Sequence, residues 1–574
     1  MNYSSPDGKD LSIVLCGAAG QGIKTVEKLL VHALKRSNYN VFASREYMSR
    51  VRGGNNSTEI RVGSRPVKAL VDRIDILIAL NPGLRPNIRS RLDDRTIILG
   101  DREELGNEFE NRPGNFMNVD LLKMARQVGG RIYANVAAAG VIFGMLQVED
   151  SLLRDMFAEL FSSKGAEVVQ KNLEAARMGF AIGQGMVEKG LMNVNIEADP
   201  SLEGHIALDG SEAVSLGAIA GGCNLIASYP MSPATGVLTF LAQQAGKFGI
   251  VVEQIEDEIA AMNVAVGAGY AGAKAMVSTS GGGFALMSEG LSLAGIMEIP
   301  VVVHLGQRPG PATGMATRTE QADLELAVYS GHGEFPRIIL AASSIEDAFE
   351  LSARAFYLAD KYQTQVILLT DQYFLNTFYN VPAFELEGLP HPSFLVEAHE
   401  GYRRYENTET GISPRAVPGS GPGIVGVDSH EHDEWGHVQE DFELRKRMVD
   451  KRLRKLDTMD EDVTGPIFSG QEDYHTLVIS WGSTFPMIEE ALSLMDKPGM
   501  AHLHIRQIYP VTEDLGGYLA KASKLVMVEG NATAQMARLI KLHTGFEVDE
   551  RILNYRGLQF SVEEIYDALS RISG

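Results

Sequence analysis

The feature of this sequence that most constrains its fold is an alternation of short apolar runs with segments of helical pattern. In the N-terminal part the apolar runs lie at residues 11–16, 41–44, 74–80, 96–99 and 131–134, with a helical pattern at 23–36. Short apolar runs that alternate with helices are typical of sheets covered by helices. The sequence therefore predicts an α/β fold built on open sheets.

The length of the chain predicts several domains. At 574 residues it is too long for one hydrophobic core, since a domain holds about 150 residues on average. Residues 190–210 are polar and irregular, and the composition changes again from about residue 380, so both places are predicted to connect domains. We expect three open-sheet α/β domains at residues 1–190, 205–395 and 471–574, and an interdomain linker region at 396–470.

Composition excludes several classes of partner and cofactor. The formal charge of −22 argues against a nucleic-acid or anionic-membrane surface, because these polyanions attract basic proteins. The two cysteines, Cys16 and Cys223, are too few for a disulfide framework or for an iron-sulfur cluster, which thiolates normally hold. The N-terminus has no signal-peptide pattern, and no apolar run reaches the roughly eighteen residues of a membrane span. We expect a cytoplasmic protein.

A glycine-rich motif, Gly17-Ala-Ala-Gly-Gln-Gly22, joins the first apolar run to the first helix. A Walker-type loop needs Lys after its last Gly, where this chain has Ile23, and the dinucleotide fingerprint has a different glycine spacing. Two interpretations stay open, a plain strand-to-helix turn and a phosphate contact at the helix N-terminus.

A local basic excess follows at residues 44–68. Its cations are Arg45, Arg50, Arg52, Arg61, Arg65 and Lys68. In so acidic a chain such a cluster is either a solvated face or subunit contact, or a site near coenzyme phosphates, and Gly53-Gly54 would let a ligand approach the backbone.

The second domain places chemistry-bearing residues after its predicted strands. The strands at 225–229, 251–253, 275–278 and 301–305 are followed by loops that contain Ser232, Glu258, Gly281-Gly282-Gly283 and Arg308. Because loops at the carboxyl ends of parallel strands gather at one edge of a sheet, we expect these residues to converge.

These motifs resemble those of a known family. Residues 228–235 are similar to the Tyr-Pro-Ile-Thr-Pro loop in the α subunit of 2-oxoacid:ferredoxin oxidoreductases. The glycine triplet, the Arg308 loop and Thr319-Glu-Gln-Ala-Asp-Leu are similar to its later motifs. The N-terminal glycine motif and Arg52-Gly-Gly resemble the γ subunit, so the chain resembles a γ-α fusion, most like the α subunit of 2-oxoglutarate:ferredoxin oxidoreductase.

The C-terminal part of the chain also resembles a known domain, and two positions elsewhere in the chain depart from the family pattern. Residues from about 475 resemble the C-terminal domain of transketolase-like enzymes, including Glu529, Asn531 and Gln535 at their spacing. The resemblance thus implies a γ-type domain, a pyrimidine-binding-type domain and a transketolase C-terminal-like domain. Two positions depart from the family pattern: Met231-Ser232 replaces Ile-Thr, and Gly282 stands where Pro is common.

The resemblance implies thiamine diphosphate chemistry. A carboxylate at N1′ of the cofactor's aminopyrimidine favours the tautomer that takes the thiazolium C2 proton, and the family motif gives this catalytic role to Glu258, with Glu256 and Asp257 as alternatives in register. Arg308 suits bidentate binding of a substrate carboxylate, to which Ser232 would add a hydrogen bond. The remaining candidates are Thr235 and Thr313 for the substrate and Tyr229, Pro230 and Gly282 for the cofactor.

The implied reaction is oxidative decarboxylation of a 2-oxoacid, 2-oxoglutarate first, with coenzyme A to an acyl-CoA, CO2 and reduced ferredoxin. Mg²⁺ and a [4Fe-4S] cluster would lie in a β subunit, in an (αβ)2 heterotetramer. The alternatives are specificity for pyruvate or a branched-chain 2-oxoacid, a non-catalytic scaffold subunit, and a nucleotide-binding protein that uses the Gly17 turn.

The segment before the last domain carries two further patterns. His430, His432 and His437 lack the i, i+4 pairing of a helical zinc site, so we expect no metal there. The basic run at residues 445–455 has apolar residues at heptad-like spacing, namely Phe442, Val449 and Leu456, which predicts a solvated amphipathic helix.

Overall fold

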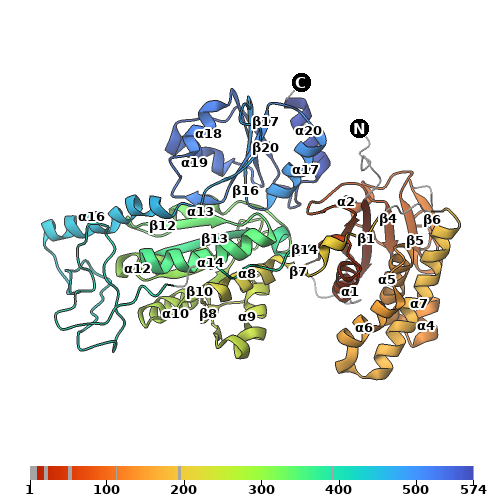
Figure 1. The fold of residues 1–574 in the computed structure, drawn as a ribbon, viewed down its shortest axis with the longest axis horizontal. Coiled ribbons are helices and arrows are strands. Elements are labelled where there is room, and N and C mark those ends of the chain that lie inside the picture. Colours follow the sequence, from red (N-terminus) through yellow and green to blue (C-terminus); the bar gives the residue numbers. More distant parts are fainter. Residues whose placement is uncertain are drawn as a thin grey trace. The chain divides into compact units, whose positions relative to one another are not determined.

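The computed structural model describes residues 10–18, 23–48, 55–110, 113–191, 196–389 and 392–572. The strands in these residues form three open sheets with helices around them, which confirms the predicted α/β fold class (Figure 1). The chain divides into two compact units. The first comprises residues 1–209, 376–383 and 561–563, and the second comprises residues 210–375, 384–560 and 564–574.

The sheet of the first unit has eight strands in the order β6-β5-β4-β1-β3-β2-β14-β7. Their bounds are β1 (Asp10–Ala18), β2 (Asn40–Glu46), β3 (Asn55–Gly63), β4 (Ile76–Ala79), β5 (Ile97–Gly100), β6 (Asn115–Asn118), β7 (Ile206–Asp209) and β14 (Thr377–Val381). The segments of β7 and β14 lie within residues 205–395, the range expected from the sequence for the second domain. Here β14 pairs antiparallel with both β2 and β7, so backbone hydrogen bonding brings these two short segments into the first sheet.

The helices of the first unit are α1 (Ile23–Arg36), α2 (Pro86–Arg89), α3 (Arg102–Leu105), α4 (Leu121–Val128), α5 (Ala134–Met145), α6 (Asp150–Phe161) and α7 (Ala166–Glu188). The strand predicted at residues 131–134 was wrong, because a short 3-10 turn there leads directly into α5. All residues of α5 are buried, and its alanines favour a helix that packs closely on α7. Gly140 and Gly183 lie where any Cβ would meet the backbone of the facing helix.

Two arginines of the basic cluster in the first unit form ion pairs with buried acids. Arg45 pairs with Glu27 and with Asp209, each at 3.1 Å, and its side chain is 11% exposed. Arg61 pairs with Asp10 at 2.7 Å. These arginines therefore neutralise buried acids and do not form a solvated face. Arg50, Arg52, Gly53 and Gly54 lie outside the described residues, as do residues 19–22 of the glycine-rich motif.

The central sheet of the second unit has seven strands in the order β18-β12-β13-β11-β10-β8-β9. Their bounds are β8 (Leu225–Ser228), β9 (Val251–Gln254), β10 (Ala275–Thr279), β11 (Val301–Gln307), β12 (Arg337–Ala341), β13 (Gln365–Asp371) and β18 (Gln507–Tyr509). All neighbours are parallel except β12 and β18. The helices around the sheet are α8 (Gly210–Ala220), α9 (Thr235–Phe248), α10 (Glu258–Tyr270), α11 (Gly281–Leu286), α12 (Ser288–Met297), α13 (Leu324–Tyr329), α14 (Ile345–Tyr362) and α15 (Gln372–Leu375).

A five-stranded sheet follows in the order β15-β17-β16-β19-β20. Its strands are β15 (Ile467–Gly470), β16 (Thr476–Trp481), β17 (Met500–Ile505), β19 (Lys524–Glu529) and β20 (Glu550–Leu553), and its helices are α17 (Phe485–Met495), α18 (Leu515–Lys521), α19 (Gln535–Thr544) and α20 (Val562–Ile572). One apolar core contains residues of both sheets, such as Val277 and Leu305 of the central sheet and Leu477 and Trp481 of the five-stranded sheet. Because β18 also pairs with β12, the C-terminal residues complete the central sheet as well as their own.

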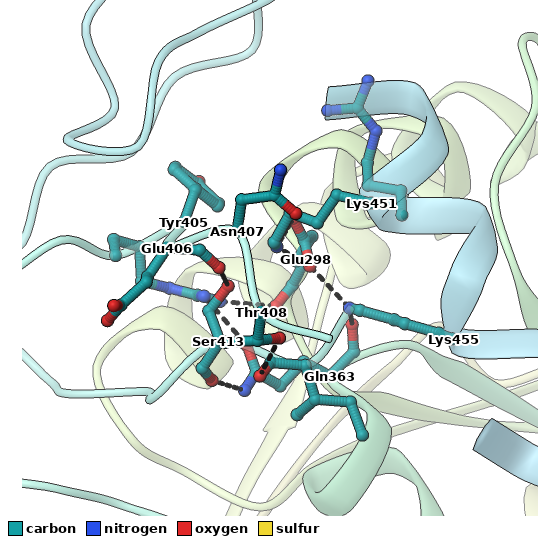
Figure 2. Close-up of polar contacts among 12 residues, drawn as sticks. Glu298, Gln363, Tyr405, Glu406, Asn407, Thr408, Ser413, Lys451 and Lys455 are labelled. Carbon is teal, nitrogen blue, oxygen red and sulfur yellow. Dashed lines mark hydrogen bonds and ion pairs between the residues drawn. The ribbon is translucent and has the colours of Figure 1, made fainter. Parts of the chain in front are cut away.

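The segment before this sheet is held by a buried ion cluster at α16 (Phe442–Met459). Figure 2 shows Lys451 and Lys455 reaching from α16 to Glu298, which accepts from Lys451 Nζ at 2.7 and 2.9 Å and pairs with Lys455 at 2.6 Å. Arg404 donates to the Glu298 carbonyl oxygen at 2.6 Å. The two lysines hold the pKa of Glu298 far below its usual range, against the effect of burial.

The predicted amphipathic pattern of α16 does not describe its packing. Phe442 is 88% exposed, whereas Lys451 and Lys455 are buried. The helix thus turns cations inward, because Glu298 supplies their counter-charge. The helix itself was predicted from the sequence, but its buried face was not.

Candidate active site

Three strand-end loops meet at one edge of the central sheet. The order β11-β10-β8 is parallel throughout, so Ser228, Thr279 and Gln307 end neighbouring strands on the same side. The chain leaves these strands in the loop that contains Ser232, in the glycine turn that opens α11, and in the loop that begins at Arg308. In such sheets ligands bind outside the carboxyl ends of the strands.

Two of the predicted residues touch each other there. Arg308 Nη1 donates a hydrogen bond to the carbonyl oxygen of Ser232 at 2.7 Å. Burial lowers the pKa of Arg308, and Asp323 opposes this effect. The guanidinium is thus positioned by the Ser232 loop and is half-buried at the sheet edge.

The structure also distinguishes the three acids that precede α10. Glu256 is exposed, and Asp257 caps the helix by accepting from Ala260 N at 2.8 Å. Glu258 is the first residue of the helix and is 3% exposed. Its Oε1 is buried and has no hydrogen-bond partner among the described residues. A buried carboxylate oxygen without a donor is what a ligand-contacting acid offers before its ligand binds.

The glycine triplet lies between two carboxylates. A Cβ at Gly283 would lie 2.6 Å from Glu258 Oε1, and a Cβ at Gly281 would lie 2.5 Å from Asp323 Oδ2, so neither position has room for a side chain. Gly282 is exposed between them. This turn therefore presents bare backbone toward the edge at which Glu258 and Asp323 lie.

Asp323 is a site residue that the sequence analysis did not single out. Burial, and to a lesser extent Glu320, raises the pKa of Asp323 to about 6, while Arg308 acts in the opposite direction. Its Oδ2 is buried without a hydrogen-bond partner among the described residues. The available signal was its place in the 319–324 motif, but the sequence could not show that this loop returns to the glycine turn.

Comparison with known proteins identifies the family of this chain. The family model described as pyruvate flavodoxin/ferredoxin oxidoreductase, thiamine diP-bdg, matches residues 216–451, and that of pyruvate ferredoxin/flavodoxin oxidoreductase matches residues 12–182. The 2-oxoacid:ferredoxin oxidoreductase subunit alpha of a Sulfolobus species is 30% identical over 98% of this chain and 97% of its own. The chain belongs to this family of 2-oxoacid:ferredoxin oxidoreductase α subunits.

Two more matches extend over almost the whole α subunit. The 2-oxoglutarate oxidoreductase subunit KorA of Mycobacterium tuberculosis is 27% identical over 98% of this chain and 92% of its own. The solved structure of 2-oxoglutarate:ferredoxin oxidoreductase from Magnetococcus marinus, with 2-oxoglutarate, coenzyme A and succinyl-CoA bound, superposes with a TM-score of 0.89 at 28% identity. That match covers 98% of this chain and 99% of the other. The resemblance predicted from the sequence motifs is therefore confirmed.

The C-terminal part of this α subunit positions the loop that carries Asp323. Gln321 donates to the carbonyl oxygen of Trp481 at 3.0 Å and accepts from Gly530 N at 2.8 Å. Gln535 donates to the carbonyl oxygen of Ala322 at 2.9 Å. Glu529, Asn531 and Gln535 thus lie where the C-terminal part contacts the loop that carries Asp323. Glu529 accepts from Asn531 Nδ2 and from two backbone N–H groups at the start of α19.

The other predicted residues lie in or next to the Ser232 and Arg308 loops. The Tyr229 side chain is 41% exposed, and Pro230 is half-buried beside it. Thr235 begins α9, and its backbone N–H donates to the Met231 carbonyl oxygen at 3.1 Å. Thr313 is exposed in the Arg308 loop. Their roles stay predictions.

The histidines near residue 430 are used locally. The His432 ring lies against that of Tyr405, tilted by 33° with ring centroids 3.9 Å apart, and His430 and His437 pair with neighbouring aspartates. Within the ranges that the structure describes, no group of three His, Cys, Asp or Glu side chains is arranged to hold a metal ion. In the same ranges, no helix is long and apolar enough to cross a membrane.

Proposed function

We propose that this chain is the α subunit of a thiamine-diphosphate-dependent enzyme that oxidises 2-oxoglutarate with coenzyme A to succinyl-CoA, CO2 and reduced ferredoxin. One observation carries the proposal. The buried carboxylate of Glu258, with an oxygen that lacks a donor, lies at the same sheet edge as the guanidinium of Arg308. An acid for the cofactor and a cation for the substrate carboxylate are the two groups that this chemistry requires of the chain.

The donor set fits the pyrimidine half of the cofactor. The unpartnered Oε1 of Glu258 would accept a hydrogen bond from protonated N1′, and Gly283, at which a Cβ would collide with Glu258, lets this carboxylate lie directly against the backbone of the glycine turn. Tyr229, Pro230 and Gly282 would contact the same pyrimidine ring. When bound, thiamine diphosphate supplies a nucleophilic carbon for the 2-oxo group and an electron sink for the loss of CO2.

Substrate binding falls to Arg308 and the Ser232 loop. The guanidinium, held by the Ser232 carbonyl oxygen, has further N–H donors for the 2-oxoacid carboxylate. The Ser232 hydroxyl would add a hydrogen bond, with Thr235 and Thr313 as additional candidates. Orienting the substrate in this way lowers the entropic barrier of the addition step.

A β subunit would supply what this chain lacks. The only cysteines, Cys16 and Cys223, are both buried, and burial raises the pKa of each thiol to about 12, so neither suits cluster ligation. We therefore place Mg²⁺, the diphosphate site and a [4Fe-4S] cluster in the β subunit of an (αβ)2 heterotetramer in the cytoplasm. Ferredoxin would accept the electrons there.

Initial rates on the purified α–β complex test this function. Ferredoxin reduction would be measured with 2-oxoglutarate, pyruvate and a branched-chain 2-oxoacid, each with and without coenzyme A. We expect coenzyme-A-dependent turnover that is fastest with 2-oxoglutarate, the substrate bound in the Magnetococcus marinus structure. Faster turnover with pyruvate would change the substrate assignment, and no turnover with any 2-oxoacid would contradict the enzymatic proposal.

A further inference from the structure

The carboxylate of Asp323 occupies an unusual place at the sheet edge. Asp323 directly precedes α13, where an aspartate would ordinarily cap the helix, yet its side chain makes no capping hydrogen bond. Instead it lies against Gly281, in the glycine turn whose other end contacts Glu258. Two acids with an unpartnered buried oxygen therefore flank one short backbone turn.

The backbone around Asp323 is held from several sides. Its N–H donates to Gln307 Oε1 at 3.1 Å, and Gln307 directly precedes Arg308. The two preceding residues are held by Gln535 and Gly530 of the C-terminal part. A buried oxygen without a donor is energetically unfavourable, so a backbone that is held from several sides and keeps it there is characteristic of a functional site.

The hydrogen bond to Gln307 holds Asp323 beside the Arg308 loop, and the charge of Asp323 acts on Arg308 and hence on any anion bound there. We propose that Asp323 is a positioning residue that weakens the hold of Arg308 on the 2-oxoacid carboxylate and so favours its departure as CO2. This inference rests on the proposed function. Before reaction the substrate carboxylate is negative and is repelled by Asp323. When the bond between its carbon and the 2-carbon breaks, the electron pair stays on the 2-carbon side and neutral CO2 leaves, so the repulsion disappears.

The ionisable groups around Asp323 determine the pH range in which Asp323 is charged and repels the substrate carboxylate. Arg308 faces it from the strand-end loop, Glu320 from its own loop, and Glu258 from the far side of the glycine turn. On α13, Glu325 is paired with Arg538 at 2.7 Å. The contacts from the C-terminal part to residues 321 and 322 are amide and backbone groups. With a pKa of about 6, Asp323 is ionised at pH 7 to 8 and becomes neutral below pH 6.

The test is the Asp323→Asn variant in the α–β complex, with CO2 release followed by rapid quench from carboxyl-labelled 2-oxoglutarate. Removal of the repulsive charge should lower KM about 3- to 10-fold and slow the release step by a similar factor, so kcat/KM changes little. In the wild type KM should rise as the pH increases through about 6, and in the variant it should stay level. A raised or unchanged KM in a folded variant would overturn the proposal.

Glu320→Gln provides an independent test that leaves Asp323 in place. Because Glu320 contributes to the raised pKa of Asp323, its loss should move the KM step to lower pH and leave KM at pH 8 unchanged. A step that stays at its wild-type pH would argue against Asp323 as its source. If the wild-type complex turned over no 2-oxoacid, the proposed function itself would be wrong. If the wild type were active but its KM did not change with pH, only the role of Asp323 would be wrong.

Discussion

The buried ion cluster at α16 offers a prediction whose size can be worked out from its contacts. Glu298 is the counter-charge for Lys451 and Lys455, both of which are buried. Glu298→Gln keeps the shape of the side chain and removes the charge. Breaking a buried pair by removal of one partner costs about 3–5 kcal/mol, because the remaining charge stays buried.

The lower end of that range applies above pH 7. Burial lowers the pKa of Lys451 to about 7, so at pH 8 this lysine is already mostly neutral and loses little when Glu298 is neutralised. Lys455 is then the cation that loses its partner at 2.6 Å. We expect the free energy of local opening of α16 to fall by about 3 kcal/mol. This corresponds to a roughly 100-fold larger population of molecules in which α16 is open.

Amide hydrogen exchange of α16 measures this opening directly. Peptides from residues 442–459 should exchange roughly 100-fold faster in Glu298→Gln, while those from β16 and β17 keep their protection. Glu443→Gln, a charge-neutralising change at an exposed position of the same helix, serves as the matched control and should change protection by less than about 0.5 kcal/mol. Unchanged exchange of α16 in Glu298→Gln would refute the reasoning.

Three further changes test neighbouring parts of the account. Gly283→Ala should abolish 2-oxoacid turnover with little loss of assembly, measured by ferredoxin reduction and size-exclusion chromatography, because a Cβ there would lie 2.6 Å from Glu258 Oε1. Arg308→Lys should raise KM for the 2-oxoacid about 10-fold or more in steady-state assays, since an ammonium cannot bind a carboxylate in bidentate fashion. After correction for intrinsic exchange, the α16 amides should gain protection from about pH 7 to 9. The folded pKa of Lys451 lies below its ordinary value near 10.5, so in this pH range the open state binds more protons than the folded state, and a rise in pH favours the folded state. Lys451→Met should remove this pH dependence.

The strand-end loops show how far the sequence could predict the site. Ser232 and Arg308 were expected to converge because both follow strands of one parallel sheet, and the hydrogen bond between them joins the loops after β8 and β11, which lie on either side of β10. Glu258 was chosen from three adjacent acids through the family motif. The structure gives the physical distinction, since Asp257 is used as the cap and Glu256 is exposed.

The features that sequence reasoning missed depend on contacts between distant segments. Asp323 reaches the glycine turn because Gln321 and its neighbours are bound by residues more than two hundred positions later in the chain. Lys451 and Lys455 are buried because Glu298 neutralises them, and a pattern of apolar residues along one helix contains no information about that partner. Backbone pairing of β14 with β2 is likewise invisible to local patterns.

The most direct test of the central claim is the rate of 2-oxoglutarate-dependent ferredoxin reduction by an α–β complex that carries Glu258→Gln. The amide keeps the shape of the buried side chain but cannot share a proton with the aminopyrimidine as a carboxyl group does. We predict at least a 100-fold loss of turnover with unchanged assembly of the two subunits. Turnover at the wild-type rate in the assembled variant would contradict the role of Glu258 and, with it, the placement of the active site at this edge of the sheet.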